Sequence, residues 1–394
     1  MAYTLTREAL LMDLYVAFLC AKRHKGSKPY VKRFEKHLME NLTELRDVLW
    51  DRSYRPAPSS CFIIERPKKR EVFAAQFRDR VVHHLYYNYT HELFERTFIA
   101  DSYSCVPGRG THYGIERLAD HIRKASRNYT MKCYVMKLDI RGYFMHIDRQ
   151  RLLEIAIDSL QKMAKRTDGI DMDFVLWLTR EIILLDPNEN CHVVGSEQDW
   201  LGLDPAKSMR FVNSGKGMPI GNLTSQLFSN VYLNEFDQYM KRTLGCKHYG
   251  RYVDDAYVVS TDRRWMLSLF PDIRQFLEER LGLTLHMGKL RVTDTRYGVE
   301  FLGAFIKHYR KYASNSCLRR MERNIMNLRT RDHEAVYHSV NSFLGVLCHY
   351  KTYKIRRKMF LKERFLRIST FNNDISRYGK PTTSFQPIRK TLTE

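Results

Sequence analysis

Apolar side chains recur at helical spacing in the first fifty residues. Within residues 5–50 they stand three and four positions apart, which is the pattern of helices with one buried face. They are Leu10, Leu11, Leu14, Tyr15, Phe18, Phe34, Leu38 and Leu42. The pattern predicts helices, with a break near Lys25 where a basic stretch contains a glycine.

The pattern changes from helix to strand over residues 61–84. Two apolar runs flank the basic tripeptide Lys68-Lys69-Arg70, and a helix is predicted from about Asp79. A hairpin with a cationic tip is suited to gripping a triphosphate by charge and hydrogen bonds. Lysines at a strand edge also discourage aggregation, and the pattern alone leaves both interpretations open.

Acidic residues stand at the ends of two further apolar runs or inside them. The run 133–139 ends on Asp139, and a helix is predicted to follow from Asp148 as its N-cap. The run Arg251–Val259 is aromatic and β-branched, yet it holds the adjacent pair Asp254 and Asp255. This composition favours a hairpin with the acid pair at or near its turn.

A lone acid pair can be an ordinary turn between strands. Carboxylates crowded in apolar surroundings, however, repel each other and lose hydration unless a cation compensates them. Mg²⁺ takes oxygen ligands and shares them with substrate phosphates. Acids from two strands also match the needs of two ions about 3.5–4 Å apart in phosphoryl transfer. The pattern therefore predicts a divalent-metal site.

The remaining segments give coarser predictions. Residues 166–212 are polar and irregular, with Cys191-His192 interpreted as part of a loop, and a Gly/Pro loop then leads into a long helix through Met240. A helix over 265–281, a turn at 287–289 and strands around 292 and 299–305 follow. From about residue 310 to 368 the chain is interpreted as helical and strongly basic.

Composition indicates the class of partner. The chain has 394 residues, 44% of them hydrophobic, and a formal net charge of +22, which favours a globular nucleic-acid-binding protein. An anionic membrane is the weaker alternative, because no apolar run approaches the length that spans a bilayer. The eight cysteines are scattered without a C-x-x-C pair. They indicate a reduced, cytoplasmic protein without a zinc site.

Taken in order, these segments resemble a reverse transcriptase. The order is the basic finger, the strand of Asp139 with its two following aromatics, the Gly/Pro loop and helix, the Tyr252-Val253-Asp254-Asp255 hairpin, the Lys289 turn and Phe301-Leu302-Gly303. The resemblance covers residues 61–305 and implies an α+β right-hand polymerase fold. Its parts would be 1–130 for the N-terminal helices and fingers, 131–307 for a palm with an insertion at about 150–212, and 308–394 for a helical basic thumb and tail.

The resemblance also implies the metal site and the catalytic residues. It implies that Asp139, Asp254 and Asp255 hold two Mg²⁺ ions, with Mn²⁺ as an alternative and the Ile140 carbonyl as a further ligand. Lys289 resembles the lysine near the leaving pyrophosphate, a candidate general acid. The activity implied is RNA-directed DNA polymerisation, a nucleotidyl transfer from dNTPs to a DNA primer on template RNA.

Other roles follow from the same resemblance. Phe144, with Tyr143 as the alternative, resembles the gate that excludes a ribose 2′-hydroxyl. The segment Phe301-Leu302-Gly303 resembles the primer grip. The residues implied to grip the triphosphate are Lys68, Lys69, Arg70 and, as a further candidate, Arg78.

One loop indicates a narrower family. Most reverse transcriptases carry Pro-Gln-Gly and Ser-Pro here, whereas this chain has Pro219-Ile220-Gly221 and Ser225-Gln226. This is similar to the reverse transcriptases of diversity-generating retroelements, which implies a bacterial or phage enzyme. Such an enzyme copies a template-repeat RNA with errors at adenines, for mutagenic retrohoming, usually with a basic pentameric accessory variability protein. Ile220 would offer only apolar contact near the nascent pair, so polar discrimination is lost.

Other classes of function stay open on the sequence. A retron, defence or group II intron-like reverse transcriptase shares the same palm, although room for a maturase's nuclease extension is lacking after the thumb. An RNA-dependent RNA polymerase also carries an acid pair and would prefer ribonucleotides. A non-catalytic RNA-binding scaffold would need a defect elsewhere, because all three palm acids are present.

Overall fold

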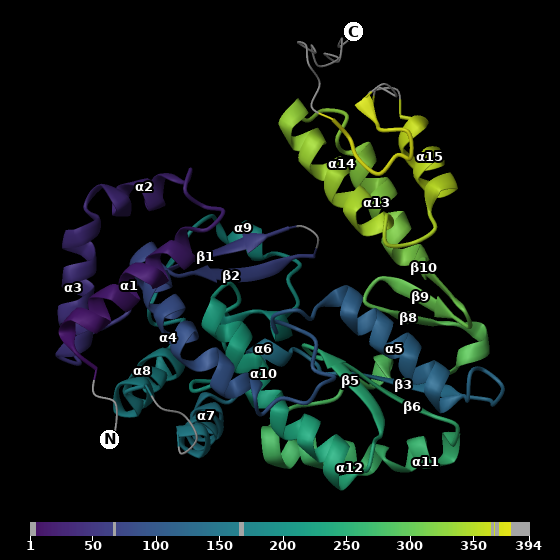
Figure 1. Ribbon diagram of the computed structural model, residues 1–394, viewed down its shortest axis with the longest axis horizontal. Helices are drawn as coiled ribbons and strands as arrows, with labels where there is room; N and C mark the ends of the chain where they lie inside the picture. Colours follow the sequence, from purple (N-terminus) through teal and green to yellow (C-terminus); the bar gives the residue numbers. More distant parts are fainter. Residues whose placement is uncertain (1–4, 66–67, 165–168, 364–365, 367–369, 380–394) are drawn as a thin grey trace. The chain divides into compact units, whose positions relative to one another are not determined.

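The computed structural model describes residues 5–65, 68–164, 169–363, 366 and 370–379 (Figure 1). The chain divides into two compact units. Unit 1 comprises Met1–Gly114, Met136–Val258 and Asp262–Arg291, and unit 2 comprises Ile115–Val135, Val259–Thr261 and Val292–Glu394. The three-part division into fingers, palm and thumb stays a prediction, and the end of its last part, 380–394, lies outside the described residues.

The N-terminal region forms helices, as the apolar spacing predicts. They are α1 (Arg7–Lys22), α2 (Pro29–Lys36) and α3 (Leu38–Trp50). α1 packs against α3 and against α4 (Phe77–Glu95). The rings of Phe18, Phe34 and Phe77 meet there, and the Phe34 and Phe77 centroids are 5.2 Å apart. This buried aromatic cluster fixes the helices to one another.

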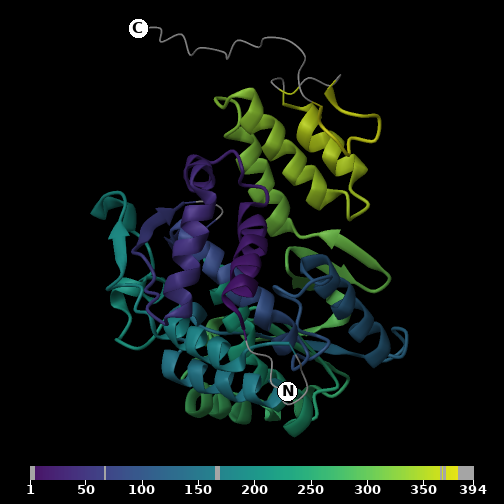
Figure 2. The same ribbon diagram turned by 60° about the vertical axis from the view of Figure 1, so that its left-hand side comes forward.

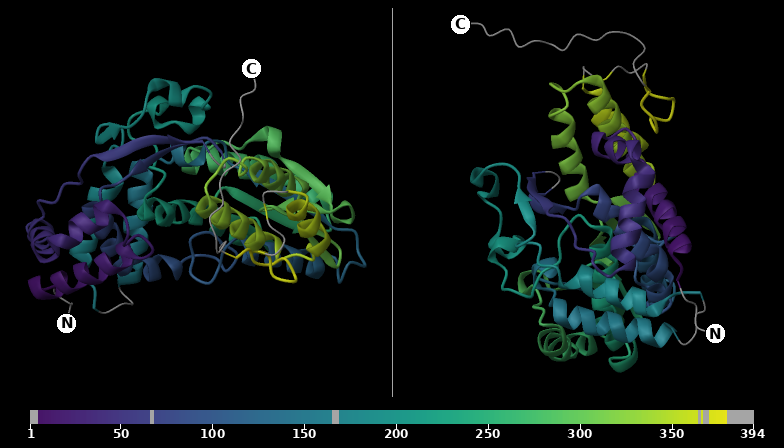
Figure 3. Two further views of the ribbon diagram at one scale, coloured as in Figure 1. Left: turned by 90° about the horizontal axis from the view of Figure 1, so that it is seen from above. Right: turned by 90° about the vertical axis from the view of Figure 1, so that its left-hand side faces the viewer.

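The predicted basic hairpin is confirmed. β1 (Ser59–Ile64) pairs antiparallel with β2 (Arg70–Ala74), and the two strands form a long ribbon (Figure 3). A third strand, β4 (Cys191–Val193), pairs parallel with β1. The loop predicted for Cys191-His192 is therefore wrong. Three residues that pair with a strand far away in the chain give no local periodicity from which a strand could be predicted.

The segment predicted as an insertion begins with two regular helices and ends in short turns. α7 (Arg149–Ala164) and α8 (Met172–Leu184) lie side by side (Figure 2), and α9 (Glu197–Trp200) follows β4. A buried carboxylate fastens this segment to β2. Glu71 accepts hydrogen bonds from Trp200 Nε1 at 2.7 Å, from Ser208 Oγ at 3.0 Å and from the Met209 amide.

A four-stranded sheet carries the acidic residues. Its strand order is β5-β6-β3-β7. The strands are β3 (Tyr134–Asp139), β5 (His248–Tyr252), β6 (Asp255–Ser260) and β7 (Arg291–Asp294). The two-residue connection Val253-Asp254 makes β5 and β6 a hairpin, as predicted. β3 lies next to β6, so Asp139 and the acid pair come from neighbouring strands.

The helices before and after the β5–β6 hairpin belong to unit 1. α10 (Leu223–Gln238) packs against α4 and α7 and continues as the π-helix η3 (Tyr239–Thr243). After the β5–β6 hairpin the chain forms further helical segments. They are α11 (Arg263–Ser268), α12 (Phe270–Gln275), the π-helix η4 (Phe276–Arg280) and the 3₁₀ turn η5 (Met287–Lys289).

Unit 2 combines a small antiparallel sheet with a helical cluster. α5 (Thr111–Ala125) enters it, and the sheet order is β10-β9-β8. The sheet and helices are β8 (Val299–Phe301), β9 (Ala304–Lys307), β10 (Arg310–Ala313), α13 (Asn315–Met326), α14 (His333–Leu347) and α15 (Tyr353–Leu361). Buried apolar side chains of the three helices, among them Met321, Leu344 and Phe360, form one core.

The prediction of helix from about residue 310 is wrong at its start. Arg310–Ala313 is the strand β10, which pairs with β9 in the register Arg310↔Lys307. The two-residue turn His308-Tyr309, with Tyr309 at φ 62°, reverses the chain. Pairing with a preformed neighbour outweighs local composition in so short a segment. No helix in the described part of the chain has the length and apolar character needed to cross a membrane.

Candidate active site

Asp139 is held at the end of β3 by backbone bonds on either side of Ile140. The Asp139 carbonyl accepts from the His286 amide at 2.8 Å, and the Arg141 amide donates to Thr284 at 2.9 Å. Ile140 and Leu285 form an isolated antiparallel β-bridge, and the two hydrogen bonds lie on either side of this residue pair. The role of the Ile140 carbonyl as a further oxygen ligand stays a prediction.

The acid pair sits on a strained turn. Val253 has φ 56°, a left-handed conformation that is unfavourable for a β-branched residue. Asp254 completes the turn and Asp255 begins β6. Strain of this kind persists only where surrounding contacts fix the backbone. The turn therefore depends on groups outside itself.

Burial and mutual repulsion disfavour the charged forms of these carboxylates. Burial, then Asp255 and Asp139, raise the pKa of Asp254 from 3.8 to about 6. Burial and the charge of Asp139 also raise the pKa of Asp255, while Lys137, Lys289 and Lys68 oppose this shift. Each carboxylate is thus within electrostatic reach of the others, and the site favours an added cation.

Lysines already supply part of that positive charge. Lys289 Nζ lies 2.7 Å from Asp139 Oδ2. Burial opposes the charged form of Lys289, but the hydrogen bond and charge of Asp139 outweigh it and raise the lysine pKa. Lys137 stands two residues before Asp139 on β3, so both side chains share one face of the strand. Sequence analysis missed Lys137, although strand alternation with Asp139 could have indicated it.

The donor chemistry fits a divalent metal, although the carboxylates are not gathered around a single point. Among the described residues no group of three or more His, Cys, Asp or Glu side chains is placed to hold an ion. The pKa values of two of these oxygen donors, Asp254 and Asp255, are raised by burial and by neighbouring carboxylates. Hard cations prefer such a set, and Asp139 would exchange its lysine contact for a shared ion.

A buried arginine is hydrogen-bonded to the turn that carries the acid pair. Arg251 is 1% exposed and makes a two-pronged ion pair with Asp237, with Nε–Oδ1 at 2.7 Å and Nη2–Oδ2 at 2.6 Å. Its Nη1 donates to the Val253 carbonyl at 2.8 Å. Tyr249 donates to Asp237 at 2.7 Å, and Asn230 accepts from Arg251 at 3.3 Å. This network fixes the strained peptide beside Asp254.

Segment 101–103 forms backbone hydrogen bonds with Arg251. The Arg251 amide donates to Asp101 and the Tyr103 amide donates to the Arg251 carbonyl, at 2.9 and 3.0 Å. The hydroxyls of Tyr103 and Tyr257 are 2.7 Å apart. A Cβ at Gly250 would lie 2.2 Å from the Tyr103 hydroxyl, so only glycine fits there. Segment 101–103 thus contacts the strands of the acid hairpin.

The two candidate gate residues lie in different environments. Tyr143 is 2% exposed, and its hydroxyl donates to the Ser229 carbonyl at 2.5 Å. Phe144 is only half-buried, and its carbonyl accepts from the Met218 amide at 2.8 Å. A residue that contacts a sugar must reach solvent in the unliganded protein. This favours Phe144, and its gate role stays a prediction.

The basic finger residues are not equivalent. Lys68 and Arg70 are exposed, and Lys68 is close enough to Asp255 to lower its pKa. Lys69 instead donates to the Leu201 carbonyl at 2.8 Å. It also pairs with Glu65. Lys68 and Arg70 are therefore the better candidates for contacting a triphosphate.

Arg78 is occupied elsewhere. Its guanidinium lies 5.7 Å from the centre of the Tyr54 ring, and its Nη2 is 3.9 Å from Glu44. These contacts belong to α3 and the segment that follows it. They do not support the predicted contact between Arg78 and a nucleotide.

The loop with the unusual sequence lies against the finger hairpin. The Phe73 amide donates to the Ile220 carbonyl at 2.8 Å, and the Ile220 side chain packs on an apolar cluster that includes Met145, Trp200 and Met209. Gly221 has φ 127°, and a Cβ there would lie 2.8 Å from the Phe73 oxygen. The loop is therefore fixed to β2 by a backbone hydrogen bond and by close packing.

Gln226 and the predicted primer grip belong to other elements than this loop. Gln226 is exposed on α10 and accepts from the Cys105 thiol at 3.4 Å. Phe301-Leu302-Gly303 belongs to unit 2, where Leu302 and Gly303, at φ 49° and 83°, form the two-residue turn between β8 and β9. Their roles stay predictions.

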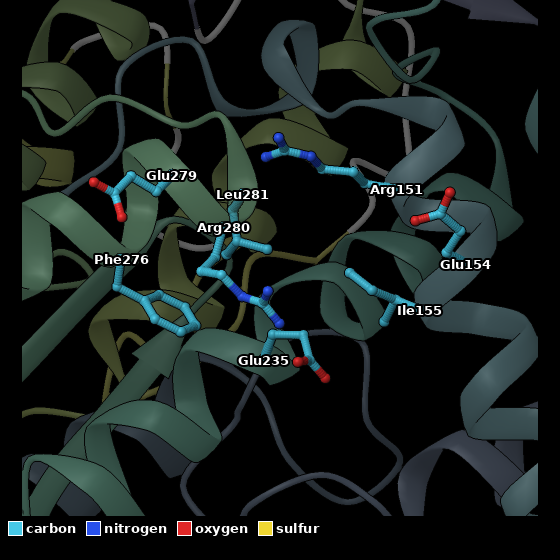
Figure 4. A pocket seen from close by; sticks show the side chains of 8 residues that line it. All are labelled: Arg151, Glu154, Ile155, Glu235, Phe276, Glu279, Arg280 and Leu281. Atoms are coloured by element: carbon cyan, nitrogen blue, oxygen red, sulfur yellow. The ribbon is translucent and has the colours of Figure 1, made fainter.

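A separate pocket of about 210 Å³ opens beside α7 and η4 (Figure 4). Arg280 reaches into it from η4 and Arg151 from α7. The described residues that line it are Arg151, Glu154, Ile155, Glu235, Phe276, Glu279, Arg280 and Leu281. This lining contains none of the residues predicted for the active site.

Mg²⁺ should stabilise the protein more at about pH 8 than at about pH 5. The folded-state pKa of Asp254, about 6, exceeds its ordinary value of 3.8. The metal-free folded state therefore binds more protons between these values, and its stability falls as pH rises through them. Thermal unfolding with and without Mg²⁺ measures the effect. Asp254→Asn should remove most of the pH dependence, and equal Mg²⁺ shifts at both pH values would contradict the assignment.

Comparison with known proteins identifies the family. A model of the family described as reverse transcriptase (RNA-dependent DNA polymerase) matches residues 66–306. The match covers more than half of the chain, so the protein belongs to this family. Membership agrees with the predicted α+β right-hand polymerase fold and with the enzyme class of RNA-directed DNA polymerases.

Individual relatives are distant. The chain is 25% identical to Protein YkfC of Escherichia coli (strain K12) over 300 residues, which are 68% of this chain and 71% of YkfC. Candida albicans telomerase, solved with a fragment of telomeric RNA, is 12% identical with a TM-score of 0.45, over 78% of this chain and 55% of the telomerase. Apo telomerase from Candida tropicalis is 10% identical with a TM-score of 0.48, over 74% and 52%. The chain thus spans about half the length of these telomerase chains.

Proposed function

We propose that this protein extends a DNA primer on an RNA template. One observation carries the proposal. The chain belongs to the reverse transcriptase family, and its sheet places Asp139 and the pair Asp254-Asp255 on neighbouring strands. Lys289 forms an ion pair with Asp139. Divalent ions bound by these carboxylates would offset the charge that develops on the primer 3′-oxygen and on pyrophosphate.

The chain's own residues would position the substrates. Lys68 and Arg70 at the finger tip would bind the triphosphate. Phe144, partly exposed, would contact the sugar and exclude a 2′-hydroxyl. Lys289 carries a proton that Asp139 stabilises further, and it would deliver that proton to the pyrophosphate once the carboxylate is shared with an ion. Positioning and electrostatics supply most of the catalysis in this chemistry.

We further propose that the enzyme belongs to a diversity-generating retroelement. The sequence Pro219-Ile220-Gly221, with Gln226 after Ser225, supports this assignment. Ile220 stands beside β2 with an apolar side chain, so the loop offers no polar side chain at this position. The template would be a template-repeat RNA copied with errors at adenines. A small basic pentameric protein would be the partner, and the cDNA would replace a variable repeat.

Primer extension on a defined RNA with Mg²⁺ and dNTPs, followed by sequencing of the cDNA, tests both proposals. We expect DNA products with errors concentrated opposite template adenines. Ile220→Gln should reduce those errors several-fold, because a polar group can then discriminate against a wrong pair. Ile220→Leu is the matched apolar control and should leave the error pattern unchanged.

The possible outcomes separate the two proposals. Accurate cDNA from the natural protein would indicate a reverse transcriptase of another class, such as a retron or defence enzyme. Products made only from ribonucleotides would indicate an RNA polymerase. RNA binding without any product, repeated with the native RNA and its accessory protein, would favour a non-catalytic scaffold.

A further inference from the structure

An exposed tyrosine marks the tip of the β9–β10 hairpin in unit 2. Lys307 and Arg310 pair across the strands, and the turn between them is His308-Tyr309. Tyr309 has φ 62° and is 73% exposed. An exposed aromatic side chain is informative where it belongs to a patch with other exposed groups. The two cations flanking the turn are exposed as well.

A second segment holds another ring against this tip. The Tyr129 ring stacks on His308 with centroids 4.6 Å apart, and meets Tyr309 edge-on at 4.4 Å. The Tyr309 hydroxyl donates to the Asn128 carbonyl at 3.3 Å. Arg127, Asn128 and Tyr129 all have positive φ, at 48°, 58° and 68°. Three consecutive non-glycine residues in this conformation are strained, and strain concentrates where a surface has a function.

A third segment completes the cluster. The hydroxyl of Thr295 and Nε2 of His308 are 3.0 Å apart, which holds the turn Thr295–Tyr297 beside the hairpin tip. Tyr297 ends this turn and is 74% exposed. Gly298 follows it so closely under the hairpin that a Cβ would lie 3.1 Å from Lys307 Cγ. The two open tyrosines thus belong to neighbouring segments that a hydrogen bond links.

Positive charge surrounds these rings. The exposed cations of the three segments are Arg127, Lys132, Arg296, Lys307 and Arg310. The acid among them, Asp294, is already paired with Arg296 at 2.8 Å and lies 4.0 Å from Lys132. Lys132 also stands over the Tyr134 ring at 5.5 Å. All of these residues belong to unit 2, so the cluster does not depend on where unit 1 lies.

We propose that this surface, the Tyr309 platform, binds an unpaired stretch of nucleic acid. Bases would stack on Tyr309 and Tyr297, and the phosphates between them would contact Lys307 and Arg310. Exposed rings interleaved with cations are how proteins hold single strands without reading their sequence. A duplex offers only stacked, covered bases, so it cannot use the rings. The platform is a second nucleic-acid contact, in a different unit from the three carboxylates.

The test compares probes that differ only in an unpaired extension. The full-length protein is titrated by fluorescence anisotropy with a blunt RNA–DNA duplex and with the same duplex carrying a single-stranded overhang at either end. Overhangs of RNA and of DNA are both used. We expect the overhang to increase the affinity of the natural protein about tenfold, since stacking on one ring contributes about 1–3 kcal/mol per base. Tyr309→Ala should lose most of that gain and bind the blunt duplex as before.

Three further variants separate stacking from folding. Tyr309→Phe keeps the ring and loses only the bond to Asn128, so it should bind within about twofold of the natural protein. Tyr15→Ala removes a tyrosine of unit 1 that is 40% exposed, and should change nothing. Arg310→Ala should reduce the salt dependence of overhang binding by about one counterion. Thermal unfolding confirms that each variant is folded.

Two results would overturn the platform. In the first, folded Tyr309→Ala keeps the full overhang gain, which would make the cluster a packing feature only. In the second, Tyr309→Phe is as weak as Tyr309→Ala, which would assign the effect to the Asn128 bond instead of to the ring. Nucleotide incorporation at saturating primer–template is measured separately, so failure of the proposed activity stays distinguishable.

Discussion

Asp254→Ala should abolish nucleotide incorporation while leaving affinity for RNA within a few-fold. Asp254 is a partly buried carboxylate on a strained turn. The charges of Asp255 and Asp139 both raise its pKa. Burial and these two acids all disfavour its charge, which is the reason why we propose that it binds a cation. Loss of a metal ligand removes several kcal/mol of transition-state stabilisation, which corresponds to about a thousandfold or more in rate.

A second variant, Asp254→Asn, separates loss of activity from loss of stability. Asp254→Asn keeps the shape of the side chain and removes the repulsion that raises the pKa of Asp254. We therefore expect the metal-free Asn variant to melt at a higher temperature than the natural protein, although it is inactive. Asp272→Asn removes an exposed acid of α12 and should leave both properties unchanged. Incorporation that survives in Asp254→Ala would show that the metal assignment is wrong.

The second large effect concerns Arg251, which touches the acid turn only through the Val253 carbonyl. Arg251→Met alone leaves the fully buried Asp237 without its cation, and should destabilise the fold by about 3–5 kcal/mol. The double variant Arg251→Met/Asp237→Asn replaces the buried pair by neutral groups, and the new side-chain amide oxygen could still accept from Tyr249. Neutral replacements of buried ion pairs often cost little, so most of the stability should return.

Activity should not return with stability. In the double variant the Val253 carbonyl has lost its donor, so the turn that carries Asp254 is no longer fixed. We expect incorporation to fall about ten- to a hundredfold, because a small displacement of catalytic groups has an effect of that size. The Mg²⁺ concentration for half-maximal incorporation should rise as well. A folded double variant with the natural rate and Mg²⁺ requirement would show that Arg251 has only a structural role.

The carboxylates could be predicted because their signal is local. An acid at the end of an apolar run, and an acid pair between two such runs, are visible within a few residues of sequence. The chain order of these runs then limits the fold. The predicted helices of the N-terminal region and the two hairpins followed from the same local periodicity.

What the sequence could not predict depends on contacts between distant segments. Arg251 looks like one polar residue in a strand, and only the fold brings Asp237 onto it from α10. Lys69 looks equivalent to Lys68, yet the Leu201 carbonyl, 132 positions away, engages it. The rings of Tyr129 and Tyr309 come from segments 180 residues apart. No spacing within a short window encodes such pairs.

Glu71 also has a consequence for the order in which the protein folds during synthesis. Its carboxylate, 0% exposed, is satisfied by Trp200, Ser208 and the Met209 amide, which lie 129, 137 and 138 positions later in the chain. In a nascent chain Glu71 lacks these partners until residue 209 has been made, and its carboxylate stays hydrated until then. At about 5–20 residues per second, the 138 intervening positions take about 7–28 s. The β1–β2 ribbon is thus made early, but Glu71 can be buried only after the segment 200–209 has been synthesised.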